Sequence, residues 1–329
     1  MKKIAVFGAN GNIGNQAVKA FGKAGWQVRA ITRNGQYNHA QGIETATANA
    51  MDKAQVVAAT KGCNYIINCV NPPYPKWHEM CMPIAVNIIT AAQQHEAVHL
   101  FPANVYNYGT QIPAIVTDET VMEPDTKKGL IRQDMERLFE QFAVEKNVQT
   151  LMLRAGDFFG GPHSQASWFD TVITRSLAKG KLTYPGPLDV VHSWAFLPDM
   201  AQAFVNIAEQ SDELSNFESF LFKGHAITGN QLKSAIEQVI EKQCKLSGLP
   251  WPILRFAGLF SPMMREISEM SYLWKSPHEM DDRKLQQTIR NLQHTPLLKA
   301  VFQSLAESKI ISPDKMKLSM RTQAIRQSS

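Results

Sequence analysis

The sequence predicts an α/β fold: a doubly wound parallel sheet with a smaller, mostly helical C-terminal lobe. Two observations point to the sheet. Strand-like apolar runs alternate with helix-like segments through the first half of the chain, and a glycine-rich turn follows the first run. Such alternation is typical of parallel sheets that carry helices on both faces. The lobe is predicted because the alternation ends after Gly160–Pro162, and from Pro250 the composition shifts towards Met, Trp and Pro.

The predicted elements follow from the local patterns. Short runs that are apolar throughout indicate buried strands, and apolar residues at helical spacing indicate amphipathic helices. The expected strands are Lys3–Phe7, Gln27–Thr32, Tyr65–Val70, Val98–Phe101 and Thr150–Arg154. The expected helices between them are Asn12–Ala24, Ala54–Thr60, Met82–His95 and Ile131–Lys146. Further along we expect helices at Ser167–Lys179, Leu197–Gln210 and Gly229–Glu241, and a returning strand at Phe217–Phe222.

The composition and charge of the chain limit the kinds of binding partner that we expect. The 329 residues are 44% hydrophobic and 19% charged, and the formal net charge is only +5. The chain has no block of like charges and no run of about eighteen apolar residues, so neither nucleic acid nor a membrane is an expected partner. A strand begins almost at once, with no signal peptide before it, so we expect a cytoplasmic protein. The cysteines and histidines lack metal-ligand spacing, and no metal site is expected.

The residues from Gly8 to Gly14 form the most informative motif. Glycines occupy its first, fourth and seventh positions, between a strand and an amphipathic helix. Gly8 allows a tight exit from the strand, Gly11 lets the backbone approach a pyrophosphate, and Gly14 permits close packing of helix on sheet. The phosphates would lie at the positive N-terminal end of the helix. The motif therefore predicts a Rossmann-type unit that binds a nicotinamide dinucleotide.

The end of the second strand favours NADP(H) over NAD(H). NAD-specific sites usually place an Asp or Glu there, whereas this chain has Thr32 and Arg33 and no carboxylate. Arg33 is suited to a 2′-phosphate and Thr32 adds a hydroxyl; the alternative is that Arg33 is simply solvated. The residues that we expect to contact the cofactor are Gly8, Asn10, Gly11, Asn12, Ile13, Gly14, Thr32, Arg33, Asn49, Asn71 and Arg132.

The domain organisation follows from these elements. We expect residues 1–160 to form the NAD(P)-binding Rossmann domain, with residues 195–225 packing back onto it. Residues 161–194 and 226–329 are expected to form a substrate-binding lobe and a C-terminal tail. The aromatic and Met residues of this lobe either line an apolar substrate pocket or form a helical core.

The glycine spacing and several later motifs resemble the extended short-chain dehydrogenase/reductase family, of the NAD-dependent epimerase/dehydratase type. The resemblance covers roughly residues 1–305. It implies the family's Rossmann fold, a nicotinamide cofactor and a small-molecule substrate. The matching segments are Asn49 and Asp52, Asn87, Val105-Tyr106 with Gly109, Arg154–Gly156 with Phe159-Gly160, Phe196–Ala201 and Pro296-Leu297.

The sequence departs from that family at its usual catalytic residues. Pro102 stands at the family's serine position. Counting back from Glu136, which matches a family glutamate, the tyrosine and lysine of the YxxxK pair fall on Lys128 and Arg132. The resemblance therefore implies an atypical member with a remodelled acid–base site.

Three residues are candidates for catalysis at such a site. Lys128 is a candidate proton donor if burial or Arg132 lowers its pKa, and Arg132 is expected to hold the cofactor ribose. Tyr106 follows the expected strand Val98–Phe101 near the expected nicotinamide end, and Tyr108 is an alternative to it. Lys128 could equally belong to a solvated helix start, and Tyr106 could be a packing residue.

We therefore expect an NADP(H)-dependent oxidoreductase that acts on an unidentified small carbonyl or hydroxyl compound. A non-catalytic NADP(H)-binding or sensing protein is the alternative, which the loss of the Ser, Tyr and Lys set favours. A sugar-nucleotide epimerase or dehydratase rests on the family resemblance alone. The sequence leaves the substrate, the reaction direction and the oligomeric state open, and a homodimer is among the assemblies it allows.

Overall fold

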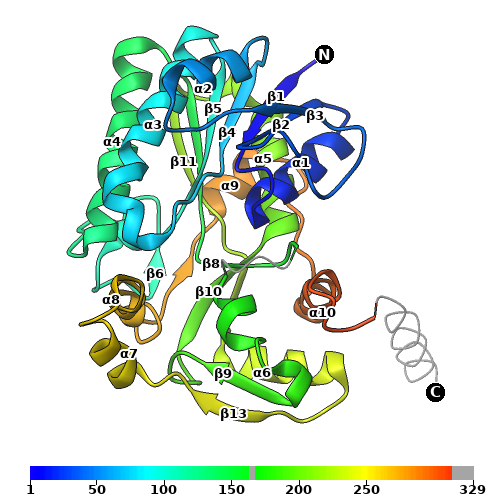
Figure 1. Ribbon diagram of the computed structural model, residues 1–329, viewed down its shortest axis with the longest axis vertical. Helices are drawn as coiled ribbons and strands as arrows, with labels where there is room; N and C mark the ends of the chain where they lie inside the picture. Colours follow the sequence, from blue (N-terminus) through cyan, green and yellow to red (C-terminus); the bar gives the residue numbers. More distant parts are fainter. Residues whose placement is uncertain (163–166, 313–329) are drawn as a thin grey trace.

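Parallel strands form the central sheet of the computed structural model, which describes residues 1–162 and 167–312 (Figure 1). Within these residues the sheet is 7-stranded, in the order β11-β7-β5-β4-β1-β2-β3, with all pairs parallel. The direction of winding reverses between β1 and β4, where ligands bind in folds of this kind. The strands are β1 (Lys3–Phe7), β2 (Gln27–Thr32), β3 (Glu44–Thr47), β4 (Tyr65–Asn68), β5 (Val98–Ala103), β7 (Thr150–Arg154) and β11 (Phe217–Leu221).

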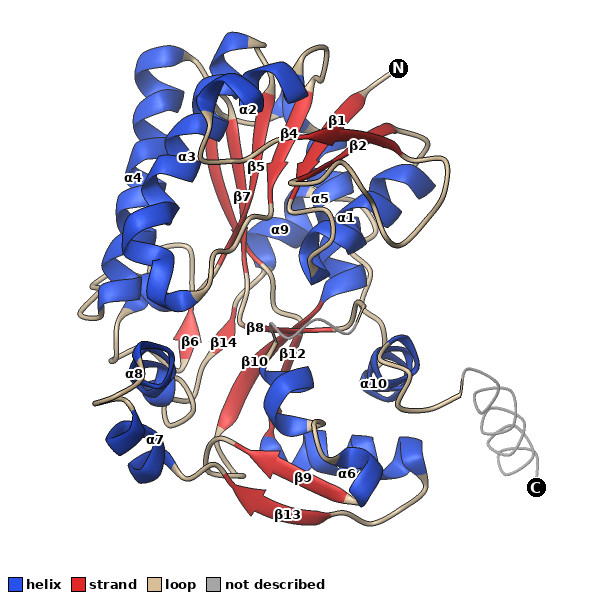
Figure 2. Ribbon diagram, in the orientation of Figure 1, coloured by secondary structure: helices blue, strands red, loops and turns tan. Residues whose placement is uncertain are grey.

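Helices cover both faces of this sheet (Figure 2). On one face α1 (Asn12–Lys23) packs against α5 (Leu197–Glu209); on the other, α3 (Trp77–Gln94) lies between α2 (Lys53–Thr60) and α4 (Lys127–Lys146). Each face has its own buried core, as expected for strands that are apolar on both sides. The doubly wound α/β fold is confirmed.

Two of these helices begin earlier than the sequence predicts. Met82 is the expected start of α3, and Pro83 would suit a first turn, yet the helix begins at Trp77 and keeps Pro83 inside. Helix α4 begins at Lys127, where the Thr126 hydroxyl accepts a hydrogen bond from the Gly129 amide at 3.1 Å. This cap places the first turn of α4 beside the ends of β4 and β5.

The lobe contains short strands as well as helices. Among the described residues, the strands outside the central sheet are β8 (Asp157–Phe159), β10 (Val191–Phe196) and β12 (His225–Thr228) in one sheet, with the pairs β9 (Lys181–Tyr184) and β13 (Lys245–Gly248), and β6 (Ile115–Val116) and β14 (Glu279–Met280). Of these, β6 and β8 belong to residues 1–160, outside the range expected for the lobe. Its helices are α6 (Gly229–Ile240), α7 (Trp251–Ala257), α8 (Pro262–Glu269) and α10 (Leu297–Glu307), and α9 (Arg283–Thr288) packs against β11. The end of the tail expected within residues 226–329, from 313 onward, lies outside the described residues.

The helix expected over Ser167–Lys179 is wrong. The segment forms a π-helical turn at Phe169–Ile173 and a 3₁₀ turn at Leu177–Lys179. The hydroxyls of Thr171 and Thr174 donate to carbonyls of the preceding turn, and such β-branched residues disfavour a regular helix.

A buried ion pair joins β7 to α4. Arg154 is completely buried, and its Nη2 donates to the Oε2 atom of Glu136 at 2.6 Å. Burial alone would lower the pKa of the Arg154 guanidinium, but the Glu136 carboxylate raises it above its ordinary value. The Glu136 carboxylate therefore stabilises the positive charge of the buried Arg154 guanidinium.

We expect Glu136→Ala to lower the free energy of unfolding by about 3–5 kcal/mol, because Arg154 would keep a buried charge without its carboxylate. Asp134→Ala is the matched control, since Asp134 pairs with Arg137 at 3.7 Å on the exposed face of the same helix. It should change stability by less than about 1 kcal/mol. Urea unfolding followed by circular dichroism measures both, and equal losses would contradict the role assigned to Glu136.

Candidate functional site

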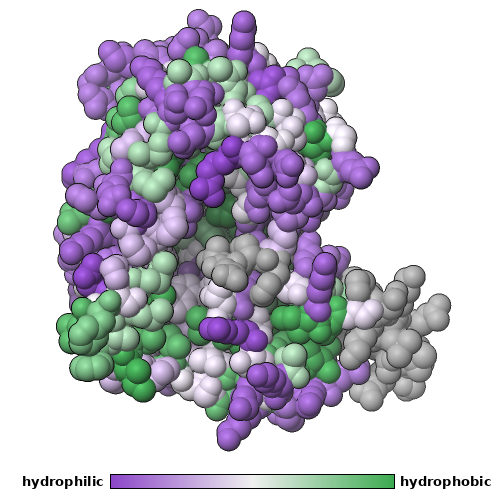
Figure 3. All heavy atoms as spheres, in the orientation of Figure 1, coloured by the Kyte–Doolittle hydropathy of each residue, from purple (hydrophilic) through white to green (hydrophobic). Residues whose placement is uncertain are grey.

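A cavity of about 790 Å³ lies at the carboxyl ends of the parallel strands. The turns after β1, β2, β4 and β5 line one side, and lobe residues including Trp168, His192 and His278 line the other. Figure 3 shows the face of the molecule hollowed between these two parts. This is the place at which the switch of winding direction predicts a ligand.

The glycine turn forms the wall of the cavity at β1. Gly8 has φ +70°, and a Cβ there would lie 2.7 Å from the Cys69 carbonyl oxygen of the neighbouring chain segment. A Cβ on Gly14 would lie 2.2 Å from the Gly8 carbonyl oxygen. Helix α1 begins after Gly11, and the described residues supply neither a side-chain cap nor an acidic residue in its first turn. This end of the helix therefore suits a phosphate.

The residues expected at the adenosine end lie around the same cavity. Arg33 is exposed, lines the cavity and has no ion pair within the described residues, while the Thr32 hydroxyl donates to Asn34 Oδ1 at 3.2 Å. Asn10 lines the cavity, but its side chain is bonded to the loop after β2: Nδ2 donates to the Gln36 carbonyl at 2.9 Å. Asn10 therefore positions the loop that carries Arg33.

Arg132 lies on the first turns of α4 and reaches the middle of the cavity. Its Nη2 donates to Asn71 Oδ1 at 3.4 Å, and its guanidinium stacks 4.5 Å from the centre of the Trp77 ring. Burial lowers the pKa of this guanidinium. Its Nε atom is buried without a partner in the described part of the chain, as are Asn68 Nδ2 and Asn12 Oδ1, and all three residues line the cavity. Such unsatisfied polar atoms indicate a polar ligand.

These observations fit a nicotinamide dinucleotide. The glycine turn leaves room for a pyrophosphate. The N–H groups of Arg132 and Asn68 can donate to ribose or phosphate oxygens, and Asn12 Oδ1 can accept from a ribose hydroxyl. Asn49 and Asn71 also line the cavity, as does Ile13. The structure thus brings the whole set of expected cofactor residues together except Gly14, which is needed for packing and is not among the lining residues.

Two neighbouring tyrosines line the cavity. Tyr106 begins the 3₁₀ turn after β5, and its hydroxyl lies 3.1 Å from that of Tyr74, which begins the 3₁₀ turn before α3. Burial raises the pKa of Tyr74 to about 12 and that of Tyr106 well above its ordinary value, and the nearby Asp157 carboxylate contributes. Both hydroxyls therefore carry a proton at neutral pH.

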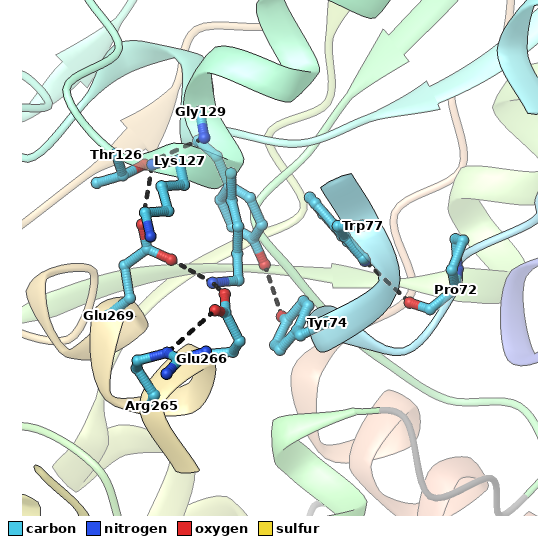
Figure 4. Close-up of polar contacts among 11 residues, drawn as sticks. Pro72, Tyr74, Trp77, Thr126, Lys127, Gly129, Arg265, Glu266 and Glu269 are labelled. Atoms are coloured by element: carbon cyan, nitrogen blue, oxygen red, sulfur yellow. Dashed lines mark hydrogen bonds and ion pairs between the residues drawn. The ribbon is translucent and has the colours of Figure 1, made fainter. Parts of the chain in front are cut away.

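The structure places Lys128 outside the residues that line the cavity. Its ammonium is buried and forms ion pairs with Glu266 and Glu269 of α8, and it lies 5.1 Å from the centre of the Tyr74 ring. Figure 4 shows Glu266 and Glu269 reaching from α8 towards the start of α4. The expected proton donation by Lys128 finds no support in this arrangement, because two carboxylates hold the charged form away from the cavity. We call these three residues the Lys128 clamp.

A histidine and an aspartate line the same cavity as the tyrosines. His192 Nε2 and Asp157 Oδ2 are 2.8 Å apart, and the His192 ring stacks flat on Trp274 at 4.3 Å. His278 lies beside His192, and burial together with His192 lowers the pKa of His278 to about 4, so that it is neutral at pH 7. The cavity thus combines phenol, carboxylate and imidazole groups, which can exchange protons with a substrate.

Sequence reasoning missed Tyr74, His278 and the two glutamates of the clamp. Tyr74 follows Asn71 and two prolines directly after the strand next to β1, so its place at the switch point was available as a signal. Glu266 and Glu269 lie 138 and 141 residues from Lys128 along the chain, and no local pattern links them.

The family profile that matches this chain is that of the NmrA-like family, over residues 1–300. The chain belongs to the NmrA-like family. No curated protein matches its sequence. The resemblance to NAD-dependent epimerases and dehydratases is confirmed for the fold.

Several solved structures share this fold with the NmrA-like chain. MoeE5, solved with UDP-glucuronic acid and NAD, matches with a TM-score of 0.76 at 14% identity, covering 94% of this chain and 99% of its own. The UDP-glucose 4-epimerase of Thermotoga maritima has a TM-score of 0.75 at 14% identity, covering 93% and 98%. The UDP-Glc/GlcNAc 4-epimerase of Campylobacter jejuni has 0.72 at 15%, covering 94% and 100%. Identities this low show the fold alone.

Membrane spans and metal clusters are both absent from the described residues. No helix in this part of the chain is long and apolar enough to cross a bilayer. Within residues 1–162 and 167–312, no group of three or more His, Cys, Asp or Glu side chains is arranged to hold a metal ion.

We expect Lys128→Met to destabilise the protein by about 2–4 kcal/mol, because it leaves two partly buried carboxylates without their cation. The affinity for NADPH should change less than about twofold, since the ammonium is not at the cavity. Lys127→Met, at the exposed neighbouring position, is the matched control and should leave stability unchanged. Thermal unfolding and calorimetric titration measure the two quantities. Unchanged stability in Lys128→Met would show that the clamp is not structural.

Proposed function

We propose that this NmrA-like protein is an NADP(H)-dependent oxidoreductase that transfers a hydride to or from a small carbonyl or hydroxyl compound. The observation that supports this most is the cavity that joins the glycine turn at Gly8 to Tyr74 and Tyr106. The bound cofactor supplies the hydride. The chain supplies the remaining requirements: a binding surface, an enclosed substrate space and a proton donor.

The preference for NADP(H) rests on Arg33. This guanidinium lines the cavity at the end of β2 and is free of ion pairs within the described residues. A 2′-phosphate would gain charge-assisted hydrogen bonds there, and no carboxylate at the end of β2 would repel it. The loop that carries Arg33 is held by Asn10, so little ordering is needed on binding.

Tyr106 is the proton donor in this proposal. It lines the cavity, and its hydroxyl is protonated at neutral pH because burial raises its pKa. When a carbonyl is reduced, negative charge develops on its oxygen, and a phenol nearby can donate its proton to that oxygen. The Tyr74 hydroxyl, hydrogen-bonded to that of Tyr106, can then donate a hydrogen bond to the phenolate that forms on Tyr106. Arg132 holds the cofactor ribose in this proposal.

A non-catalytic dinucleotide-binding protein is the second candidate function. The Lys128 clamp favours it, because the residue at the family's tyrosine position is held by carboxylates outside the cavity. Both functions predict that the protein binds NADPH, but only the oxidoreductase is expected to oxidise it. A sugar-nucleotide epimerase rests only on analogy with the UDP-sugar enzymes that share the fold.

Calorimetric titration with NADPH, NADP⁺, NADH and NAD⁺ tests the cofactor proposal. We expect NADPH to bind at least about tenfold more tightly than NADH, since a hydrogen bond to a charged group contributes about 1.5–3 kcal/mol. Arg33→Asp should remove this preference, whereas Arg137→Asp, an equally charge-reversing change on the exposed face of α4, should keep it. An unchanged NADPH preference in Arg33→Asp would contradict the role of Arg33.

NADPH oxidation with a panel of quinones, aldehydes and ketones tests the catalytic proposal. We expect Tyr106→Phe to lower kcat by about 10²–10⁴-fold, the usual contribution of a general acid, with NADPH affinity retained. Tyr108→Phe is the matched control, because Tyr108 is buried in the same turn but does not line the cavity. Full turnover in Tyr106→Phe would reject the proton donor. Tight NADPH binding with no oxidation by any compound would favour the binding protein.

A further inference from the structure

The hairpin formed by α7 and α8 exposes large apolar side chains. Figure 3 shows this apolar region as a green area over these two helices, at the lower left of the view. We call the exposed set the hairpin surface. Its members, with their exposed fractions, are Ile253 (65%), Phe256 (67%), Leu259 (73%), Phe260 (80%) and Met263 (38%). Side chains of this size are seldom exposed together in a monomeric protein unless they contact something else.

The hairpin is held in shape by specific contacts, so this exposure is a fixed property of the fold. Trp251 Nε1 donates to the Pro185 carbonyl at 2.6 Å and anchors the base of α7 to the lobe. At the turn, a Cβ on Gly258 would lie 3.0 Å from the Cα atom of Arg265, so the two helices approach closely. The rings of Phe256 and Phe260 pack edge to face at 5.8 Å. The apolar side chains are therefore presented together.

The charged residues that the hairpin carries up to Arg265 are positive. From Leu249 to Arg265 the only charged residues in the sequence are Arg255 and Arg265, and both are exposed. The first acidic residues beyond them, Glu266 and Glu269, are bound by Lys128 in the clamp. Glu266 also pairs with Arg265 at 3.8 Å, which leaves Arg255 as the arginine of the hairpin without an ion pair among the described residues (Figure 4). An apolar surface bordered by arginines is complementary to the headgroups and upper acyl chains of an anionic lipid layer.

We propose that the α7–α8 hairpin docks the protein on an anionic membrane surface. Phe256, Leu259 and Phe260 enter the interface, and Arg255 and Arg265 contact lipid phosphates. Such a surface contact needs no helix that crosses the bilayer. A second copy of the chain fits less well, because a two-fold contact through this surface would bring the arginines of both copies into one apolar interface.

The proposal places the lipid surface next to the candidate site. Helix α8 packs against the 3₁₀ turn Tyr74–Lys76, whose first residue lines the cavity. The Lys128 clamp joins the same helix to the start of α4. Docking would therefore bring apolar compounds dissolved in the lipid close to the cavity, although the docking itself does not depend on the proposed oxidoreductase activity.

Vesicle flotation tests the docking. The full chain is mixed with phosphatidylcholine vesicles, or with vesicles of equal parts phosphatidylcholine and phosphatidylglycerol. We expect binding to the anionic vesicles that weakens with added salt, because surface charges are screened. Phe256→Ser/Phe260→Ser should lower the partition coefficient about tenfold or more, given the apolar area of two phenylalanines. Arg255→Gln/Arg265→Gln should weaken binding to anionic vesicles alone.

Control variants separate docking through the hairpin surface from nonspecific adsorption and from dimer formation. Leu130→Ser/Val144→Ser removes two exposed apolar residues of α4, 48% and 78% exposed, and should keep full binding. Leu259→Ser gives a second variant if the double Phe variant does not fold by circular dichroism. The proposal is overturned if the unmodified chain does not float with anionic vesicles at low salt. It is also overturned if the α4 variant loses as much binding, or if light scattering shows a dimer that the Phe substitutions dissociate without affecting flotation.

Discussion

The close approach of Gly8 to the carbonyl of Cys69 is the constraint on which the site depends. It occurs where β1 and β4 lie side by side and the chain leaves them in opposite directions. A side chain at position 8 would force the two strands apart, and one at position 14 would lift α1 from the sheet. Because neither is present, the N-terminus of α1 lies at the same edge as the residues after β4 and β5. The cavity exists because these backbone segments are packed so tightly.

The cap at the start of α4 determines the positions of two charged side chains, Lys128 and Arg132. The Thr126 hydroxyl fixes the first turn, and the turn then directs Lys128 away from the cavity and Arg132 into it. Residues four apart lie on one face of a helix, yet their charges have different environments. Lys128 meets carboxylates from the lobe, whereas Arg132 meets the Trp77 ring and Asn71. The same turn therefore ties the lobe to the Rossmann domain and supplies a cation to the site.

The fold and the cofactor residues could be predicted because their signals are local. Apolar runs mark the strands, and the spacing from Gly8 to Gly14 marks the turn between a strand and a helix. The partners of Lys128 could not be predicted, since the contacts depend on how the lobe packs after the sheet has formed. The helix predicted over Ser167–Lys179 is wrong for another reason. The apolar spacing of this segment suits a helix, but threonine hydroxyls that bond the local backbone disrupt the regular helix. The place of Tyr74 depends on a turn whose geometry is set by α3.

Burial keeps the tyrosine pair protonated at neutral pH. Enzymes that oxidise alcohols need a base, and a neighbouring cation is the usual means of lowering the pKa of a tyrosine. Here the Lys128 ammonium, 5.1 Å from the Tyr74 ring, is neutralised by Glu266 and Glu269, and burial raises the pKa of Tyr74 to about 12. A phenol of this kind gives up a proton only when strong negative charge forms beside it, as on the oxygen of a carbonyl that accepts a hydride. The protonated tyrosines therefore suit the donor role that the proposal gives Tyr106, while the nearby Arg132 guanidinium partly counteracts the effect of burial on the pKa of Tyr74.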